Sequence, residues 1–199
     1  MKTFFLSLLV VPFFVTSAIA QCGYGVKAGI NISNHKTTGE GENVNTNPLV
    51  GFHIGGYGHY FILEPLAVQG ELLFSQKGSK WDDPYFSGKD RVNYIDIPIL
   101  VRYQFLEYLN VHTGPQLGIL VGAKQISDEG DKIDIKDYYK GTDFSLVFGA
   151  EGNLPHNINI AIRYILGVST INTEAEYWEG WKNSVWQISF IYRINQREK

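Results

Sequence analysis

The sequence predicts an all-β fold: an eight-stranded antiparallel up-and-down transmembrane β-barrel that follows a cleaved signal peptide. Eight segments of roughly ten residues alternate apolar and polar side chains, which is the period of a strand, and their length crosses a hydrocarbon core when tilted. The connections between these segments alternate between long and short. The 21 glycines, 12 tyrosines and 12 phenylalanines among 199 residues also favour strands over helices.

The N-terminus has the layout of a secretory signal peptide. Lys2 supplies a positive charge, residues 4–15 form an apolar run that is short for a membrane anchor, and Ala18-Ile19-Ala20 has the small-x-small form of a cleavage site. We therefore expect residues 1–20 to be the signal peptide and residues 21–199 to form one barrel domain. Lipidation of Cys22 is not expected, because Gln21 precedes it instead of a small residue.

Composition excludes several kinds of function. Cys22 is the only cysteine, so the chain forms no internal disulfide and no cysteine-based metal site. The formal net charge is −3 and the pI is about 5.9, so no nucleic-acid partner is expected. Asp82, Asp83 and the acids at residues 128–131 match no defined calcium loop, so we expect solvated charge there and no metal. No cofactor motif is present either.

The alternating segments are expected to form strands in chain order at residues 23–33, 49–60, 66–77, 94–105, 109–122, 143–152, 158–168 and 184–194. Short turns lie around residues 63–65, 106–108 and 153–157, and long polar loops at residues 34–47, 78–91, 123–142 and 169–182. An even number of strands places both termini on the short-turn rim. Outer-membrane barrels have short periplasmic turns, so we expect extracellular long loops and periplasmic termini.

The segment at residues 94–105 shows that alternation alone does not decide which face of a strand points into the barrel. One face is apolar, and the other carries Asp96 and Arg102. In a secreted lipocalin-like ligand carrier the polar face would be the surface, whereas in a membrane barrel it lines the lumen. The loop rhythm, the aromatic residues near strand ends and the glycines of the polar face favour the membrane barrel. These glycines are Gly25, Gly29, Gly51, Gly55, Gly114, Gly118, Gly122, Gly149 and Gly167.

Two further expectations follow for the barrel interior. Pro98 lacks a backbone donor, so we expect a break in the hydrogen-bond ladder there, in the form of a bulge. Inward charges must be paired, because an isolated buried ion costs several kcal/mol. We therefore hypothesise a charge network that plugs the lumen, formed by Lys27, Glu71, Lys77, Asp96, Arg102, Glu151, Arg163 and Arg193.

Several segments carry a family resemblance. They are GVKAGIN at residues 25–31, QGELLFSQKG at 69–78, YIDIPIL at 94–100, GPQLG at 114–118, FGA at 148–150 and IRY at 162–164. In this order the chain resembles the PorT-family outer-membrane β-barrels of Gram-negative bacteria. Gly70 departs from the family, which more often has proline there, and so does the polar tail after Ile194. The resemblance implies an outer-membrane barrel that the barrel assembly machinery inserts, and it implies no single activity, although a few family members support protein secretion.

Enzymatic chemistry finds little support in the sequence. A lipid hydrolase of this size would need a histidine near a nucleophile at the outer rim, whereas His53, His59 and His112 are expected to be packed lumen residues. Aromatic residues of the long loops are candidates for contact with a protein or glycan partner, or for packing against the rim: Tyr138, Tyr139, Tyr177, Trp178 and Trp181. The sequence thus favours a non-enzymatic barrel with a structural or accessory role in transport, secretion or surface binding. The alternatives are a small-solute porin and a secreted lipocalin-like carrier.

Overall fold

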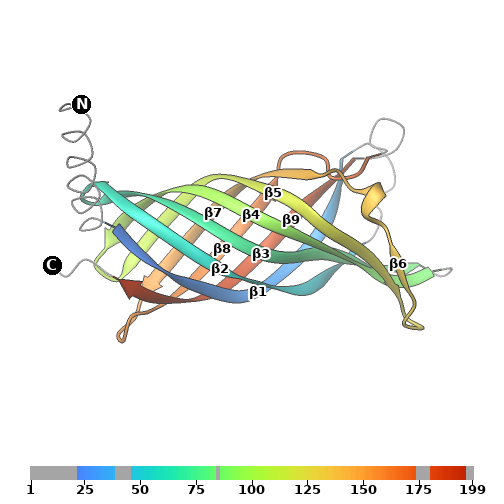
Figure 1. Ribbon diagram of the computed structural model, residues 1–199, viewed down its shortest axis with the longest axis horizontal. Coiled ribbons are helices and arrows are strands. Elements are labelled where there is room, and N and C mark those ends of the chain that lie inside the picture. The colour runs from blue at the N-terminus through green and yellow to red at the C-terminus, as the bar shows by residue number, and fades with distance from the viewer. Residues whose placement is uncertain (1–21, 39–45, 84–85, 174–179, 196–199) are drawn as a thin grey trace, which may run out of the picture.

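The computed structural model describes residues 22–38, 46–83, 86–173 and 180–195 (Figure 1). The expected signal peptide lies outside the described residues. The strands are β1 (Cys22–Thr38), β2 (Thr46–Leu63), β3 (Leu66–Asp83), β4 (Phe86–Leu106), β5 (Leu109–Ser127), β6 (Lys132–Asp134), β7 (Thr142–Asn153), β8 (Ile158–Gly167) and β9 (Gly180–Asn195), with one 3-10 helix, η1 (Lys136–Tyr138).

Eight of these strands form a closed ring. The hydrogen-bonded order is β4-β3-β2-β1-β9-β8-β7-β5, and a further pairing of β4 with β5 closes it. All neighbouring strands are antiparallel, and the short β6 adds to β5 outside the ring. Figure 1 shows the ring as one elongated barrel of tilted strands. The predicted eight-stranded antiparallel barrel is therefore confirmed.

The burial pattern is the reverse of that in a soluble protein. Most charged and polar strand residues are buried in the interior beside a few apolar clusters, whereas many large apolar side chains face outward, for example Val50 at 58% exposure and Leu72 at 59%. In the segment at residues 94–105, whose polar face could have pointed either way, Asp96 is fully buried and Ile99 is 51% exposed. The outward apolar positions form a belt around the barrel, and we call them the apolar belt. No helix in the described ranges is long and apolar enough to cross a membrane.

The two ends of the barrel differ. At one, which we call the short-turn end, Leu63 is followed closely by Leu66, Leu106 by Leu109, and Asn153 by Ile158. The opposite end, the long-loop end, differs from the sequence prediction. Residues 78–91, expected as a loop, largely continue β3 and β4, which reach Asp83 and begin at Phe86. The alternation of apolar and polar residues stops there because the outward residues beyond the apolar belt are polar, but the two strands continue to pair.

The predicted bulge at Pro98 and the predicted inward position of Gly122 are both wrong. No register shift occurs at Pro98, which pairs with Gln116 in the same register as Val101 with Thr113. The missing donor of Pro98 interrupts the ladder without adding a residue. The shift lies instead between Asn93 and Tyr94, where β5 contains one extra residue. That bulge reverses the faces of β5 beyond Leu120, and Gly122, predicted to face the lumen, has no neighbour within 4 Å of an added Cβ.

The other glycines of the polar face meet close neighbours. A Cβ at Gly55 would lie 2.0 Å from the Leu72 carbonyl oxygen, and one at Gly29 would lie 2.0 Å from the Ile188 oxygen. An added Cβ would also come within 3.0 Å of another atom at Gly25, Gly51, Gly114, Gly118, Gly149 and Gly167. These positions therefore need glycine because neighbouring strands approach closely.

Candidate functional site

The lumen holds a charge cluster nearer the short-turn end, which we call the lower cluster. Glu71 on β3 is its centre and accepts hydrogen bonds from Lys27 Nζ at 3.2 Å and from both terminal nitrogens of Arg163 at 2.6 and 2.8 Å. Gln69 Nε2 donates to the same carboxylate at 2.6 Å. The side chains of Lys27 and Glu71 are 0% exposed. The carboxylate of Glu71 thus joins β1 and β8 to β3 across the lumen.

A second ion pair belongs to the same cluster. Arg102 on β4 donates to Glu151 on β7 at 2.8 Å and to Gln69 Oε1 at 3.2 Å. Gln69 thereby links the Arg102 pair to Glu71. The lower cluster thus holds three bases and two acids, a formal charge of +1.

The upper cluster lies nearer the long-loop end. Lys77 on β3 donates to Asp96 at 2.9 Å and to Asp143 at 3.4 Å, and its ammonium lies 4.8 Å from the centroid of the Tyr94 ring. Asn183 on β9 also donates to Asp143, at 2.9 Å. One base and two acids give this cluster a formal charge of −1. The eight charges of the two clusters therefore cancel.

Sequence reasoning missed one member of the network and misplaced another. Asp143 is the second residue of β7 and lies two residues before the inward Ser145, and that shared face is the signal that could have found it. Arg193 was expected among the ion pairs, but it lies at the short-turn end and donates to the Leu154 carbonyl at 3.1 Å. Among the described residues, no ion pair includes Arg193. The other seven predicted residues all belong to one of the two clusters.

A hydrogen-bonded histidine lies deeper in the lumen. His53 Nδ1 is 3.0 Å from Asn31 Oδ1, and His53 Nε2 is 3.0 Å from Ser189 Oγ. Since an amide oxygen only accepts, Nδ1 carries the proton and Nε2 accepts from the Ser189 hydroxyl. This nucleophile, base and orienting group have the connectivity of a hydrolase triad. However, Ser189 is 0% exposed and His53 1% exposed, so neither side chain is open to solvent in this structure.

At the long-loop end, side chains from the strand ends pack together with side chains of the loops. The carboxylate of Asp90 accepts hydrogen bonds from Trp81 Nε1 at 2.7 Å, Gln125 Nε2 at 3.3 Å and Tyr139 Oη at 3.3 Å. Tyr139 is only 4% exposed and packs with Ile135, Ile171 and other apolar residues, with Trp181 against them. We call this group the mouth cap. Because it buries a carboxylate without a cationic partner, the pKa of Asp90 is raised.

His35 belongs to the mouth cap as well. It lies beyond the apolar belt, since the outward neighbours Asn34 and Lys36 are polar. Its ring stacks on Trp181 with centroids 6.1 Å apart, and Nδ1 is 3.0 Å from Ser79 Oγ. Burial lowers the pKa of His35 to about 4. The histidine is therefore neutral when the cap is in place at neutral pH.

The loop aromatics do not form one exposed surface. Tyr138 is 59% exposed, whereas Tyr139 is buried and Trp181 packs against the mouth cap. Tyr177 and Trp178 lie outside the described residues. For Tyr139 and Trp181 the alternative of packing against the rim therefore describes the structure, and Tyr138 is left available for contact.

The comparison with protein families decides what kind of barrel this is. The family model "Outer membrane protein beta-barrel domain" matches residues 18–172, most of the chain. The chain belongs to this outer-membrane β-barrel family. Its membership places the barrel in the outer membrane, with lipid against the apolar belt.

Solved structures show the same fold. The crystal structure of Ail, the attachment invasion locus protein of Yersinia pestis, aligns with a TM-score of 0.50 at 17% identity, over 87% of this chain and 99% of that one. Neisserial surface protein A, NspA, aligns with a TM-score of 0.53 at 10% identity, over 85% of this chain and 96% of that one. At these identities the likeness concerns the fold alone. No match was found among curated proteins.

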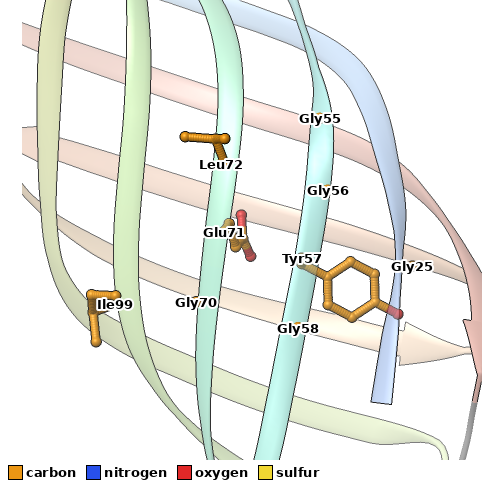
Figure 2. A pocket seen from close by; sticks show the side chains of 9 residues that line it. All are labelled: Gly25, Gly55, Gly56, Tyr57, Gly58, Gly70, Glu71, Leu72 and Ile99. Carbon is orange, nitrogen blue, oxygen red and sulfur yellow. The ribbon is translucent and has the colours of Figure 1, made fainter. Parts of the chain in front are cut away.

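A hollow of about 640 Å³ marks the wall of this outer-membrane barrel where β1 to β4 run side by side. It is lined by Gly25, Gly55, Gly56, Tyr57, Gly58, Gly70, Glu71, Leu72 and Ile99 (Figure 2). Gly58 pairs directly with Gly70, and a Cβ at Gly56, Gly58 or Gly70 would meet nothing closer than 3.6 Å. The hollow is thus a dent in the wall where Gly56, Gly58 and Gly70 leave the outward face of the strands without side chains.

Proposed function

We propose that this protein is a non-conducting, non-enzymatic outer-membrane barrel with a structural or accessory role in transport, secretion or surface binding. The observation that carries the proposal is the buried charge network of the lumen. Four bases and four acids reach across the interior from β1, β3, β4, β7 and β8 and meet in five ion pairs. An eight-stranded barrel is just wide enough for side chains to fill it, so these pairs occupy the space that a channel would need.

Two barriers in series support a closed lumen. The lower and upper clusters block the barrel within the membrane, and the mouth cap covers it at the long-loop end. A solute would have to break buried ion pairs and displace Tyr139 and Trp181 at the same time. A small-solute porin would instead need a hydrated path past these groups.

The remaining features of the proposal concern topology and assembly. Residues 1–20 act as a signal peptide and are removed, and residues 21–199 form the mature barrel domain. The long loops face the cell exterior, and both termini face the periplasm, as the connection lengths favour. The barrel assembly machinery inserts the chain. The PorT-family resemblance supports an accessory role in protein secretion as the finer assignment.

A partner at the outer loops belongs to the proposal as well. The exposed Tyr138 is the last residue of η1, directly beside the cap residue Tyr139. An exposed tyrosine on a loop anchored by a buried neighbour offers a rigid contact for a protein or glycan. Replacement of Tyr138 by alanine should weaken recovery of such a partner from outer membranes without changing the stability of the barrel.

Single-channel recording in planar bilayers tests the central claim. The refolded mature protein should show no stable open channel, and its identity as a folded barrel is checked by heat-modifiable gel mobility. Liposome swelling with small sugars provides a second measure of permeability. Large, long-lived conductance from folded protein would contradict the proposal and would favour the small-solute porin.

A further inference from the structure

Pairs of basic residues stand opposite one another on the outward face of the barrel near the long-loop end. The directly opposed partners are Lys36 and Lys182 on β1 and β9, Arg91 and Lys124 on β4 and β5, and Lys80 and Lys89 on β3 and β4. Each has a chain neighbour that is buried inside the barrel, so their own side chains face out. We call these six residues the basic pairs.

Such an arrangement is unfavourable by itself. Directly opposed residues of antiparallel strands have Cβ atoms roughly 4.5–5.5 Å apart, and like charges there repel. Within the described part of the chain, no ion pair joins any of the six to an acid. Lys124 also stands opposite Asp134 of β6, but Arg91 Nε is shielded from solvent and has no hydrogen-bond partner among the described residues. Among the described residues, most of this positive charge is therefore unmatched, and an external anion would stabilise it.

The position of Lys36 shows the depth of this charge relative to the membrane. Its ammonium donates to Tyr164 Oη at 3.2 Å and lies 5.9 Å from the centroid of that ring. Tyr164 packs on Trp186, whose side chain is 51% exposed on the apolar belt, with ring centroids 5.0 Å apart. Tyrosine and tryptophan mark the boundary between hydrocarbon and headgroups. The Lys36 ammonium thus lies at the level of lipid headgroups.

Arg91 and Lys124 occupy a comparable position on the other side of the barrel. On β4 the last apolar outward residue is Ile95, followed toward the long-loop end by Asn93 and then Arg91. On β5, Lys124 follows the outward Val121 after the bulge. Both pairs therefore lie just outside the apolar belt.

We propose that the basic pairs bind the phosphate groups of anionic lipid headgroups in the leaflet at the long-loop end. A phosphate between two opposed cations removes their repulsion, and arginine can hold two of its oxygens at once. The lipid source is favoured because the pairs border the apolar belt, where acyl chains already cover the wall. The proposal concerns the outer wall and does not rest on the closed lumen.

Brominated lipids measure the preference directly, because bromine quenches a tryptophan that it touches. The mature protein is reconstituted in phosphatidylcholine vesicles that contain either brominated phosphatidylglycerol or brominated phosphatidylcholine, and quenching of the exposed Trp186 is compared. A basic residue near an anionic surface is expected to favour the anionic lipid by roughly fivefold. Wild type should therefore prefer phosphatidylglycerol at least fivefold, and high salt should reduce that preference.

Matched variants separate the pairs from general charge. Lys36→Gln with Lys182→Gln, the pair nearest Trp186, should bring the preference close to one. Lys132→Gln with Lys136→Gln removes the same charge from exposed residues of the loop and should leave it unchanged. Heat-modifiable mobility checks that each variant is folded. Absence of a preference in wild type, which requires no variant, or an equal loss in the control would overturn the proposal.

A thermal measurement tests the source of the anion. In neutral detergent, Lys36→Gln with Lys182→Gln should raise the melting temperature, because the repulsion is removed, and added phosphatidylglycerol should raise it less in this variant than in wild type, because two basic pairs remain. Inorganic phosphate at the same concentration should have little effect. Equal protection by inorganic phosphate would mean that the pairs bind a free anion, and the lipid assignment would be wrong.

Discussion

Replacement of Glu71 by glutamine is the sharpest test of the lumen network. The carboxylate is fully buried and accepts from Lys27 at 3.2 Å and from Arg163 at 2.6 and 2.8 Å. Glutamine keeps the shape but removes the charge, so the formal charge of the lower cluster rises from +1 to +2. Removal of one partner from a buried ion pair costs roughly 3–5 kcal/mol, because the other charge stays buried without compensation. We expect Glu71→Gln to destabilise the barrel by about 4 kcal/mol.

Urea unfolding in lipid vesicles, followed by tryptophan fluorescence, measures this loss. Adding Lys27→Met to Glu71→Gln returns the formal charge to +1, and we expect it to recover on the order of 2 kcal/mol. Glu107→Gln is the matched control, since Glu107 lies in an exposed short turn and should change the free energy of unfolding by less than about 0.5 kcal/mol. If Glu71→Gln and Glu107→Gln unfold at the same urea concentration, Glu71 does not hold the network together.

Three further outcomes are expected. Gly55→Ala should destabilise the barrel by about 1–3 kcal/mol in the same urea assay, because its Cβ would lie 2.0 Å from a carbonyl oxygen, whereas the adjacent Gly56→Ala should be nearly neutral. Burial lowers the pKa of His35 from 6.5 to about 4. The neutral imidazole therefore contributes fully to the free energy of unfolding above pH 6.5, and this contribution is lost as the pH falls toward 4. Across that pH range, the free energy of unfolding should fall by up to about 3 kcal/mol more in wild type than in His35→Gln. The raised pKa of Asp90 changes the free energy of unfolding in the opposite direction, and it does so in both proteins. Ser189 should not react with a fluorophosphonate probe in folded protein, and labelling detected by mass spectrometry would argue for catalysis.

The alternation of the sequence predicts which face of a strand points into the lumen, because successive side chains point to opposite faces. It does not predict the height at which two inward residues meet. That height follows from the stagger of the strands, which depends on pairing partners and bulges. Arg193 illustrates the difference: its inward parity suggested an ion pair, but β9 places it at the short-turn end, near the register shift beside Tyr24.

The ends of the strands were predicted less well for a related reason. The apolar signal stops where lipid stops, whereas backbone pairing of β3 and β4 continues to Asp83 and Phe86. The mouth cap was also beyond prediction, since Tyr139 comes from a long polar loop whose composition suggested exposure. Only the fold brings it to Asp90, which lies 49 positions away in the chain.

The charged lumen has a consequence for folding that an apolar lumen would not have. A slip of one residue in the pairing of any strand turns all its inward side chains outward. For β3 this would move Glu71 and Lys77 out of four ion pairs and into lipid, where a basic residue at the bilayer midplane costs roughly 2–4 kcal/mol. The displaced residues would also leave Arg163 and Asp96 without partners. The lumen charges therefore favour one strand register over its neighbours.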